Sequence, residues 1–127
     1  MLRLVLASFL FLPSMAHSVT YDCTVSSKVW KDGSYSKAQI RDGQCSVKID
    51  DRGSNATLSR CSFARSEGRI TCDEYEADYI DQDPNVGVKK FYYFGGQFDI
   101  QLFASTFFVE NNGRGTIANG TCRVIRP

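Results

Sequence analysis

The sequence has almost no histidine, and this scarcity excludes several classes of enzyme. Its one histidine, His17, lies near the N-terminus in a segment that we expect to be removed or frayed. Ser-His-Asp and Cys-His nucleophilic sites use imidazole as the base, and most catalytic zinc sites use it as a ligand. We therefore expect no enzyme and no cofactor, because any remaining chemistry would rest on carboxylate, Lys or Tyr side chains.

Long runs of one charge are also missing. The chain has 15 Lys and Arg against 14 Asp and Glu, and its longest cationic run is Lys89-Lys90. Nucleic acids and anionic membranes are recognised by clustered Lys and Arg. The charge pattern therefore indicates a mixed, solvated surface and a partner that is neither nucleic acid nor membrane.

Only one long apolar run is present, over Leu4–Leu12. A membrane-spanning helix needs about 20 apolar residues, and this run has roughly half that length. Arg3 precedes it, and the small residues Ala16 and Ser18 follow it. This layout is typical of a secretory signal peptide, which is removed on export. We expect residues 1–18 to be that peptide, and the rest to be a single secreted or periplasmic domain without a membrane anchor.

The expected domain, residues 19–127, shows no amphipathic helical period over three turns. Short runs of Tyr, Phe, Val, Ile and Thr instead alternate with Gly, Asn, Asp and Ser, as in a series of hairpins. The sequence predicts an all-β fold, a small antiparallel meander of about eight strands that closes into a disulfide-stapled barrel or sandwich. The predicted strands are Val19–Val25, Lys37–Ile40, Cys45–Asp50, Ala56–Phe63, Arg69–Tyr79, Val88–Phe94, Gln97–Phe103, Thr106–Glu110 and Gly115–Ile125.

One hairpin has a register that can be read from its side chains. A two-residue loop at Ser66-Glu67 places Cys61 opposite Cys72 and Arg60 opposite Asp73. Cross-strand pairs of this kind stabilise a sheet by roughly 0.2–1 kcal/mol each, and a slip of one residue would move every side chain to the wrong face. The pairing therefore predicts a Cys61–Cys72 disulfide.

Two further turns are indicated by glycine. Gly95-Gly96 predicts a type I′ turn, whose central positions both need positive φ, and Asn112-Gly113 predicts another tight turn. The facing pairs expected from them are Tyr93–Phe98, Phe91–Ile100, Phe108–Ile117 and Val109–Thr116.

The chain contains five cysteines, so one of them is left without a partner inside the molecule. The last predicted strand is long enough to pair with the first, which would bring Cys122 to Cys23. Cys45 is then the free thiol, and it alternates with apolar residues, so we expect it to point inward as a small buried hydrophobe. The alternatives are an intermolecular bridge in a dimer, which we favour less than a monomer, or a swapped pair such as Cys23–Cys45. Because no Cys-x-x-Cys pair exists, a zinc site is not expected.

An acidic stretch follows the predicted disulfide hairpin. Glu74, Glu76 and Asp78 share one face of a strand. Paired carboxylates carry glycoside hydrolysis, but so short a chain offers no cleft for a sugar chain. A solvated strand face, or a surface for a basic partner, is the better interpretation.

A second oxygen-rich segment has the spacing of a calcium loop. Asp81, Asp83 and Asn85 occupy alternate positions, as the first ligands of such a loop do. Val86 stands where the loop's glycine belongs, so an ordinary polar turn is the preferred interpretation and calcium the weaker one.

Three aromatic residues are expected to be exposed, namely Tyr92, Phe94 and Trp30. Exposed aromatics are frequent among the residues that dominate binding energy. The alternative is that they cover a second small core.

Two Asn-x-Thr triplets, at Asn55 and Asn119, match the acceptor pattern for N-glycosylation. They would be used only in a host that exports through a eukaryotic endoplasmic reticulum.

The general plan, a small exported cysteine-stapled β domain, resembles that of bacterial periplasmic lysozyme inhibitors and other small lipocalin-like barrels. The resemblance is one of architecture over residues 19–127, without a shared motif, and it implies a binding protein by analogy only. We therefore expect a non-enzymatic binding domain for a protein or glycan. One alternative is a structural domain of the envelope or extracellular space. The other is a carrier of a small apolar ligand, lined by Phe91, Tyr93, Phe98, Ile100 and Leu102.

Overall fold

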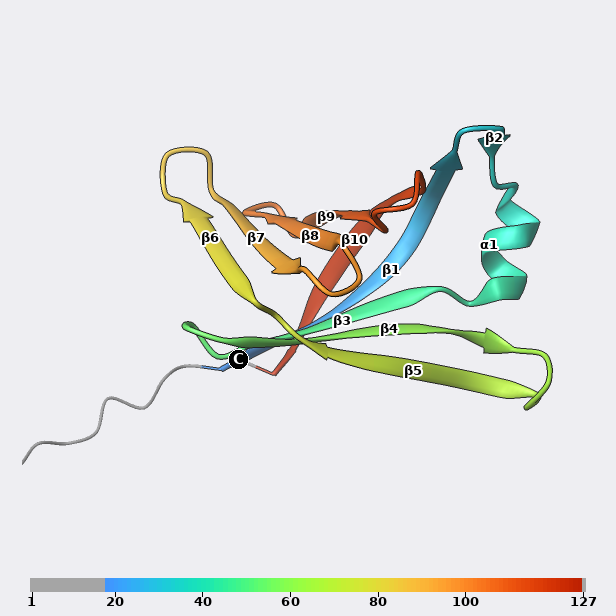
Figure 1. The fold of residues 1–127 in the computed structure, drawn as a ribbon, viewed down its shortest axis with the longest axis horizontal. Coiled ribbons are helices and arrows are strands. Elements are labelled where there is room, and N and C mark those ends of the chain that lie inside the picture. Colours follow the sequence, from blue (N-terminus) through green and yellow to red (C-terminus); the bar gives the residue numbers. More distant parts are fainter. Residues whose placement is uncertain (1–17, 127) are drawn as a thin grey trace, which may run out of the picture.

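Residues 18–126, which the computed structural model describes, form one strongly curled antiparallel sheet (Figure 1). Its strand order is β5-β4-β3-β1-β10-β9-β8-β7-β6, and the short β2 pairs with β1 outside this path. The predicted all-β fold is confirmed as a half-barrel with two disulfides. The expected signal peptide lies outside the described residues, apart from Ser18. The elements are β1 (Val19–Trp30), β2 (Gly33–Ser34), α1 (Lys37–Gly43), β3 (Ser46–Asp51), β4 (Ala56–Ala64), β5 (Arg69–Glu76), β6 (Tyr79–Asp83), β7 (Val88–Tyr93), β8 (Phe98–Phe103), β9 (Phe107–Asn111) and β10 (Ile117–Arg126).

The sheet consists of two meanders that meet twice. Strands β1, β3, β4 and β5 form one, and β6 to β10 form the other. They meet along the β1–β10 pairing, where the predicted return of the last strand to the first is confirmed. They meet again at the bend between β5 and β6. There the Ala77 N–H donates to the Ala56 carbonyl at 2.9 Å, and the Asp78 N–H donates to the Tyr92 carbonyl at 2.8 Å. One short segment therefore holds both edges of the curled sheet.

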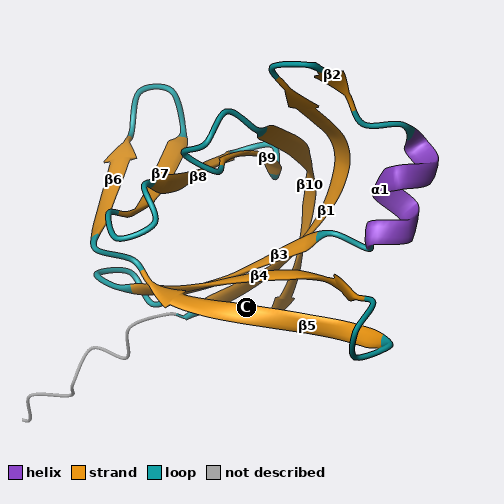
Figure 2. Cartoon of the chain, turned by 45° about the vertical axis from the view of Figure 1, so that its right-hand side comes forward, coloured by secondary structure: helices purple, strands orange, loops and turns teal. Residues whose placement is uncertain are grey.

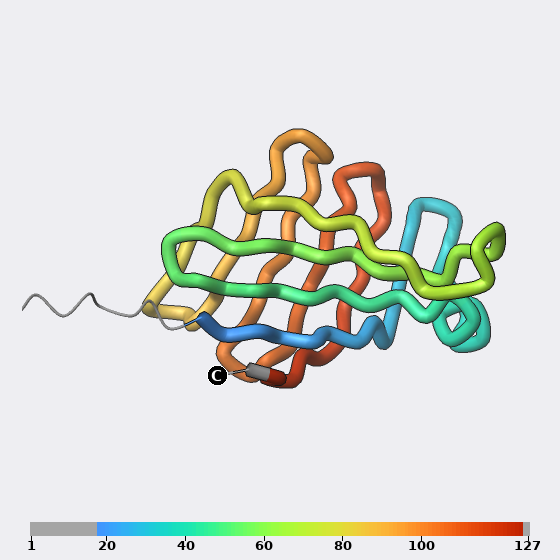
Figure 3. Tube along the Cα trace, turned by 90° about the horizontal axis from the view of Figure 1, so that it is seen from below, coloured from blue at the N-terminus to red at the C-terminus, as the bar shows by residue number. Residues whose placement is uncertain are grey.

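The hydrophobic core lies between the two halves of the curled sheet. Seen from below, the strands of the first meander run across those of the second (Figure 3). In β3, β8 and β9 buried positions alternate with more exposed ones, as in a sheet with one buried face. The largest fully buried side chains are Phe91, Phe108, Ile49, Leu58, Ile100, Val47 and Cys23. Full burial of such a side chain contributes about 1.5–3 kcal/mol.

The register predicted for the β4–β5 hairpin is confirmed. Cys61 pairs with Cys72, and Arg60 pairs with Asp73. The loop is longer than predicted and spans residues 65–68. The ladder ends at the pair Ala64–Arg69, and the Gly68 N–H donates to the Ala64 carbonyl at 2.9 Å within the loop. The Arg60 side chain forms its ion pair with a residue on β9, not with Asp73.

The register predicted for the β7–β8 hairpin is also confirmed, but the type I′ turn is wrong. Tyr93 pairs with Phe98, and neither Gly95 nor Gly96 has positive φ, whereas Gln97 has φ 56°. The glycines serve a different purpose, since a Cβ on Gly95 would lie 3.0 Å from the Tyr93 hydroxyl. A side chain at Gly95 or Gly96 would therefore crowd the Tyr93 ring.

The register predicted around Asn112-Gly113 is wrong. Phe108 pairs with Gly120, three positions from the expected Ile117. The side-chain oxygen of Asn112 accepts N–H bonds from Arg114 at 2.7 Å and Thr116 at 3.0 Å, which builds a longer turn. Gly120 also has no room for a Cβ, because the Thr24 carbonyl and the Phe108 ring lie against it.

Two predicted strands are assigned differently. Lys37–Ile40 belongs to α1, a helix started by a capping box in which Ser36 and Gln39 exchange hydrogen bonds of 3.1 and 2.8 Å. The predicted strand Arg69–Tyr79 ends at Glu76, and a separate strand, β6, begins at Tyr79. The helix covers one end of the half-barrel (Figure 2).

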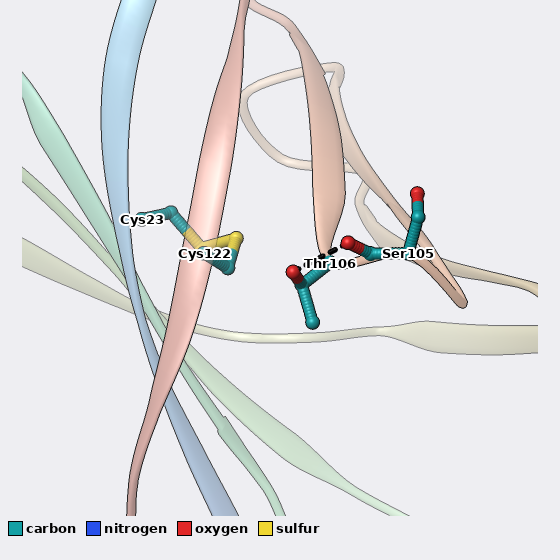
Figure 4. The surroundings of a disulfide bond; sticks show 4 residues. All are labelled: Cys23, Ser105, Thr106 and Cys122. Carbon is teal, nitrogen blue, oxygen red and sulfur yellow. Dashed lines mark hydrogen bonds between the residues drawn. A yellow bond between two sulfur atoms is a disulfide. The ribbon is translucent and has the colours of Figure 1, made fainter.

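Both predicted disulfides are confirmed, Cys23–Cys122 and Cys61–Cys72. Figure 4 shows the first of them on β1 and β10, beside Ser105 and Thr106 of the β8–β9 turn. The Cys122 N–H donates to the Thr106 carbonyl at 2.7 Å, which ties that turn to the last strand.

Cys45 is free, as predicted, and packs against the core. It is half-buried, not fully buried, and lies in the short connection between α1 and β3.

Candidate functional site

A cavity of about 230 Å³ was not predicted as a binding site, although its lining includes two predicted cysteine positions, the free thiol Cys45 and the disulfide-bonded Cys61. Residues from both meanders contribute to its wall. The lining residues are Val25, Lys28, Cys45, Ser46, Val47, Arg60, Cys61, Ser62, Asp73, Glu110, Asn112, Thr116 and Ala118. We call this space the Arg60 cavity.

An ion pair crosses the Arg60 cavity. The Arg60 Nη2 lies 2.6 Å from the Glu110 Oε1, and this contact joins β4 to β9, which are not neighbours in the sheet. The Glu110 side chain is only 8% exposed, whereas that of Arg60 is 33% exposed. The Arg60 guanidinium also lies over the Phe98 ring, 4.9 Å from its centroid. These contacts hold the guanidinium in one place.

Two more charged residues line the same cavity. Asp73 is exposed and faces Arg60 across the β4–β5 pairing, and among the described residues it forms no ion pair. The Lys28 ammonium lies 5.1 Å from the Tyr35 ring centroid. The lining therefore carries two positive and two negative side chains.

A second buried ion pair lies elsewhere on the concave side. The Lys89 Nζ is 2.7 Å from the Asp51 Oδ2, and a neighbouring cavity of about 310 Å³ is lined partly by Lys89 and Tyr79. Burial raises the pKa of the Tyr21 phenol above its ordinary value, and the Asp51 carboxylate raises that pKa further. The neutral phenol of Tyr21 is thus favoured.

Three aromatic rings form a row on β6, β7 and the residue after β7. We call Tyr79, Tyr92 and Phe94 the aromatic strip. The Tyr79 and Tyr92 rings are 5.9 Å apart and the Tyr92 and Phe94 rings 6.4 Å apart, measured between centroids. Tyr79 is 54% exposed and Phe94 is 62% exposed. Tyr92 and Phe94 were predicted to be exposed; this is confirmed for Phe94, whereas Tyr92 is half-buried. Tyr79 was missed because it was predicted to end a continuous strand, Arg69–Tyr79, and not to begin β6.

The third predicted aromatic residue does not join this row. Trp30 is 42% exposed and ends β1, at the β1–β2 hairpin. Three strands, β10, β9 and β8, separate β1 from β7 in the sheet. Trp30 and the aromatic strip are therefore separate surfaces.

The acidic residues predicted to share a surface have different surroundings. Glu76 forms an ion pair with Arg52 at 3.0 Å, and Asp78 accepts the Phe94 N–H at 2.7 Å. Glu74 is exposed and stands opposite Ser59. Only Glu74 is thus left without such a contact among these three.

The predicted oxygen-rich segment is divided between a strand and a turn. Asp81 pairs with Lys90 in the β6–β7 ladder, and the Asp83 carboxylate accepts the Asn85 N–H at 2.9 Å. Within residues 18–126, no three His, Cys, Asp or Glu side chains are grouped so that they could hold a metal ion. The arrangement is that of a hairpin turn.

The two predicted glycosylation triplets differ in accessibility. Asn55 lies in the exposed β3–β4 turn and accepts a bond from Arg52 Nε at 2.9 Å. Asn119 lies within β10 and is half-buried.

The five side chains expected to line an apolar ligand site instead take part in the core. Phe91 and Ile100 are fully buried, and Phe98 packs against the rings of Tyr75 and Tyr93. None of the five lines either cavity described above.

Comparison of the chain with protein-family models, curated proteins and solved structures gives no match. In the described part of the chain, no helix is both long and apolar enough to span a membrane.

Proposed function

We propose that residues 19–127 form an exported, non-enzymatic binding domain that contacts a partner protein through the aromatic strip. Export is supported by the charged, apolar and small-residue pattern of the first residues. The two disulfides agree with it, since disulfides persist in oxidising compartments. Because both disulfides are intramolecular, we favour a monomer over a disulfide-linked dimer.

The exposure of Tyr79 and Phe94, on either side of the half-buried Tyr92, is the observation that carries this proposal. Large rings that stay in contact with water are frequent at the centres of protein interfaces, where a few residues dominate the binding energy. The ladder pairs Asp81–Lys90 and Tyr92–Asp99 place charged residues beside the rings, as in the polar rim of an interface.

The strip is also held in place before binding. The Asp78 carboxylate accepts the Phe94 N–H at 2.7 Å, and Tyr79 and Tyr92 are paired in the ladder. These contacts order the backbone, and the ring-to-ring distances of 5.9 and 6.4 Å limit the freedom of the side chains. Ordering a side chain on binding costs about 0.5–1.5 kcal/mol, so this restriction favours binding.

The test compares three forms of the protein: wild type, Y92A/F94A and the matched control W30A. A partner is captured with the wild-type protein from the protein fraction of its own compartment and purified. Its affinity for each form is then measured by biolayer interferometry. We expect Y92A/F94A to lower the affinity by about tenfold or more, since each hot-spot residue contributes over 1 kcal/mol. W30A should leave the affinity unchanged.

Two results would contradict the proposal. One is a partner whose affinity is the same for Y92A/F94A and for the wild type, although circular dichroism shows both to be folded. The other is the capture of no protein partner, together with binding of a sugar by the strip on a glycan array. The partner would then be a glycan and not a protein.

A further inference from the structure

We propose that the Arg60 cavity binds a small zwitterion of the α-amino acid class. The cavity is independent of the aromatic strip, so this proposal does not depend on the proposed function. It rests on the meeting of positive and negative side chains around one small space, namely Arg60, Lys28, Asp73 and Glu110.

Arg60 is suited to hold the carboxylate of such a ligand. A guanidinium has five N–H donors in a planar fork that matches a carboxylate. Within residues 18–126, Glu110 is the ion-pair partner of Arg60, through Nη2 alone. Donors on the other nitrogens are left for a ligand, and the 33% exposure of the side chain lets a ligand reach them. The Glu110 contact and the Phe98 ring keep the guanidinium from turning away.

Asp73 is suited to hold the ammonium group. It lines the same cavity and is paired directly with Arg60 on the adjacent strand. The Cβ atoms of such a pair lie about 4.5–5.5 Å apart, so the two opposite charges lie side by side. An α-amino acid carries an ammonium and a carboxylate group on the same carbon, so its carboxylate can face Arg60 while its ammonium faces Asp73.

The balance of charge argues for a zwitterion over a simple ion. A simple anion would meet the carboxylates of Asp73 and Glu110, and a simple cation would meet Arg60 and Lys28. Glu110 is buried and Arg60 and Lys28 are half-buried, so these three oppose a ligand of like charge most strongly, whereas a ligand with both signs has a partner for each of its charges.

The size and floor of the cavity limit the rest of the ligand. Its volume of about 230 Å³ is below the roughly 300–1,000 Å³ of cavities that take drug-sized molecules. Val25, Val47 and Ala118 provide an apolar part of the wall. We therefore expect glycine, alanine, serine or valine to fit better than large amino acids.

Cys45 gives a direct readout, because this native thiol lines the cavity and is free. The full-length exported protein, with its disulfides intact, is treated with iodoacetamide in the presence of each of these four amino acids at millimolar concentration. A bound ligand should slow the alkylation of Cys45, and titration calorimetry should give the same affinity. N-acetyl-L-alanine and L-alanine methyl ester each lack one of the two charges. Each should bind at least about tenfold more weakly than L-alanine, because a hydrogen bond to a charged group is lost.

The matched variants are Asp73→Asn and Glu74→Gln. Asp73 forms no ion pair among the described residues, so its replacement should leave the fold intact. We expect D73N to lose about tenfold in affinity for the amino acids but little for N-acetyl-L-alanine. E74Q, on the other face of the same strand, should change neither affinity. The proposal is overturned if none of the four amino acids slows the alkylation, or if both one-charge analogues bind as tightly as L-alanine.

Discussion

Loss of the Cys23–Cys122 disulfide is expected to destabilise the protein more than loss of Cys61–Cys72. The perturbations are the double variants C23A/C122A and C61A/C72A. The bridged residues are 99 positions apart in the first pair and 11 apart in the second. In the chain-entropy model, a loop of roughly 100 residues stabilises the fold by about 4.7 kcal/mol and a loop of roughly 12 by about 2.8 kcal/mol. The expected difference is about 2 kcal/mol.

Packing acts in the same direction as loop entropy. Cys23 is fully buried and Cys122 nearly so, whereas Cys72 is exposed. Truncation to Ala therefore removes more buried sulfur from the core at the β1–β10 pairing, and a cavity left there adds to the cost.

The assay is urea unfolding of both variants in a C45A background, which prevents thiol exchange. For a small domain, free energy falls by about 1–3 kcal/mol per molar urea, so the two midpoints should differ by about 1 M. Equal midpoints, or a lower midpoint for C61A/C72A, would refute the loop-entropy reasoning. Mass spectrometry of each variant must first show that the other disulfide is intact.

Two further variants test the packing of the sheet. Arg60→Met should destabilise the protein by about 3 kcal/mol or more, because it leaves the buried Glu110 without its ion-pair partner. In a double-mutant cycle measured by thermal unfolding, adding Glu110→Leu should recover most of that loss, and additive losses would contradict this. Gly120→Ala should cost about 1–3 kcal/mol by urea unfolding, because the Thr24 carbonyl occupies the space of the new methyl group. The control Gly43→Ala, which meets only the Cys45 sulfur at 3.3 Å, should be close to neutral; equal losses would show that crowding is not the cause.

The strand pairs that could be predicted are those in which both faces of a hairpin agree. Cys61 opposite Cys72 and Tyr93 opposite Phe98 satisfy alternation on two adjacent strands at once. Such local agreement determines a register without knowledge of the rest of the fold. The free thiol at Cys45 was predictable by elimination, but this also required the Cys23–Cys122 pair, which was expected from the return of the last strand to the first.

The turns were harder to predict, because distant groups decide them. The side chain of Asn112 adds residues to its turn, and Gly120 is required by a carbonyl on β1. The helix α1 has a readable capping signal at Ser36 and Gln39, but at 7 residues it is too short to show a period. Asp81–Asp83 belongs to β6, but Asp is depleted in strands, so this segment has the composition of a loop.

The candidate sites differ in the same way. Tyr92 and Phe94 could be assigned to an outer face from one hairpin alone. The contact between Arg60 and Glu110 could not, because it joins strands that are separated in the sheet by β3, β1 and β10. A polar cavity between such strands becomes visible only when the curl of the sheet is known.

The arrangement of the two meanders has a consequence for the order of folding. Within each meander the paired strands lie closer together in the sequence than β1 and β10 do, so the meanders are expected to form before the β1–β10 pairing. The β1–β10 pairing joins the two ends of the chain, and its loop-closure entropy is the largest in the molecule. The Arg60 cavity takes its walls from both meanders. The cavity is therefore complete only after β10 has been synthesised and has paired with β1. A ligand of this cavity would bind the fully folded domain and not a folding intermediate.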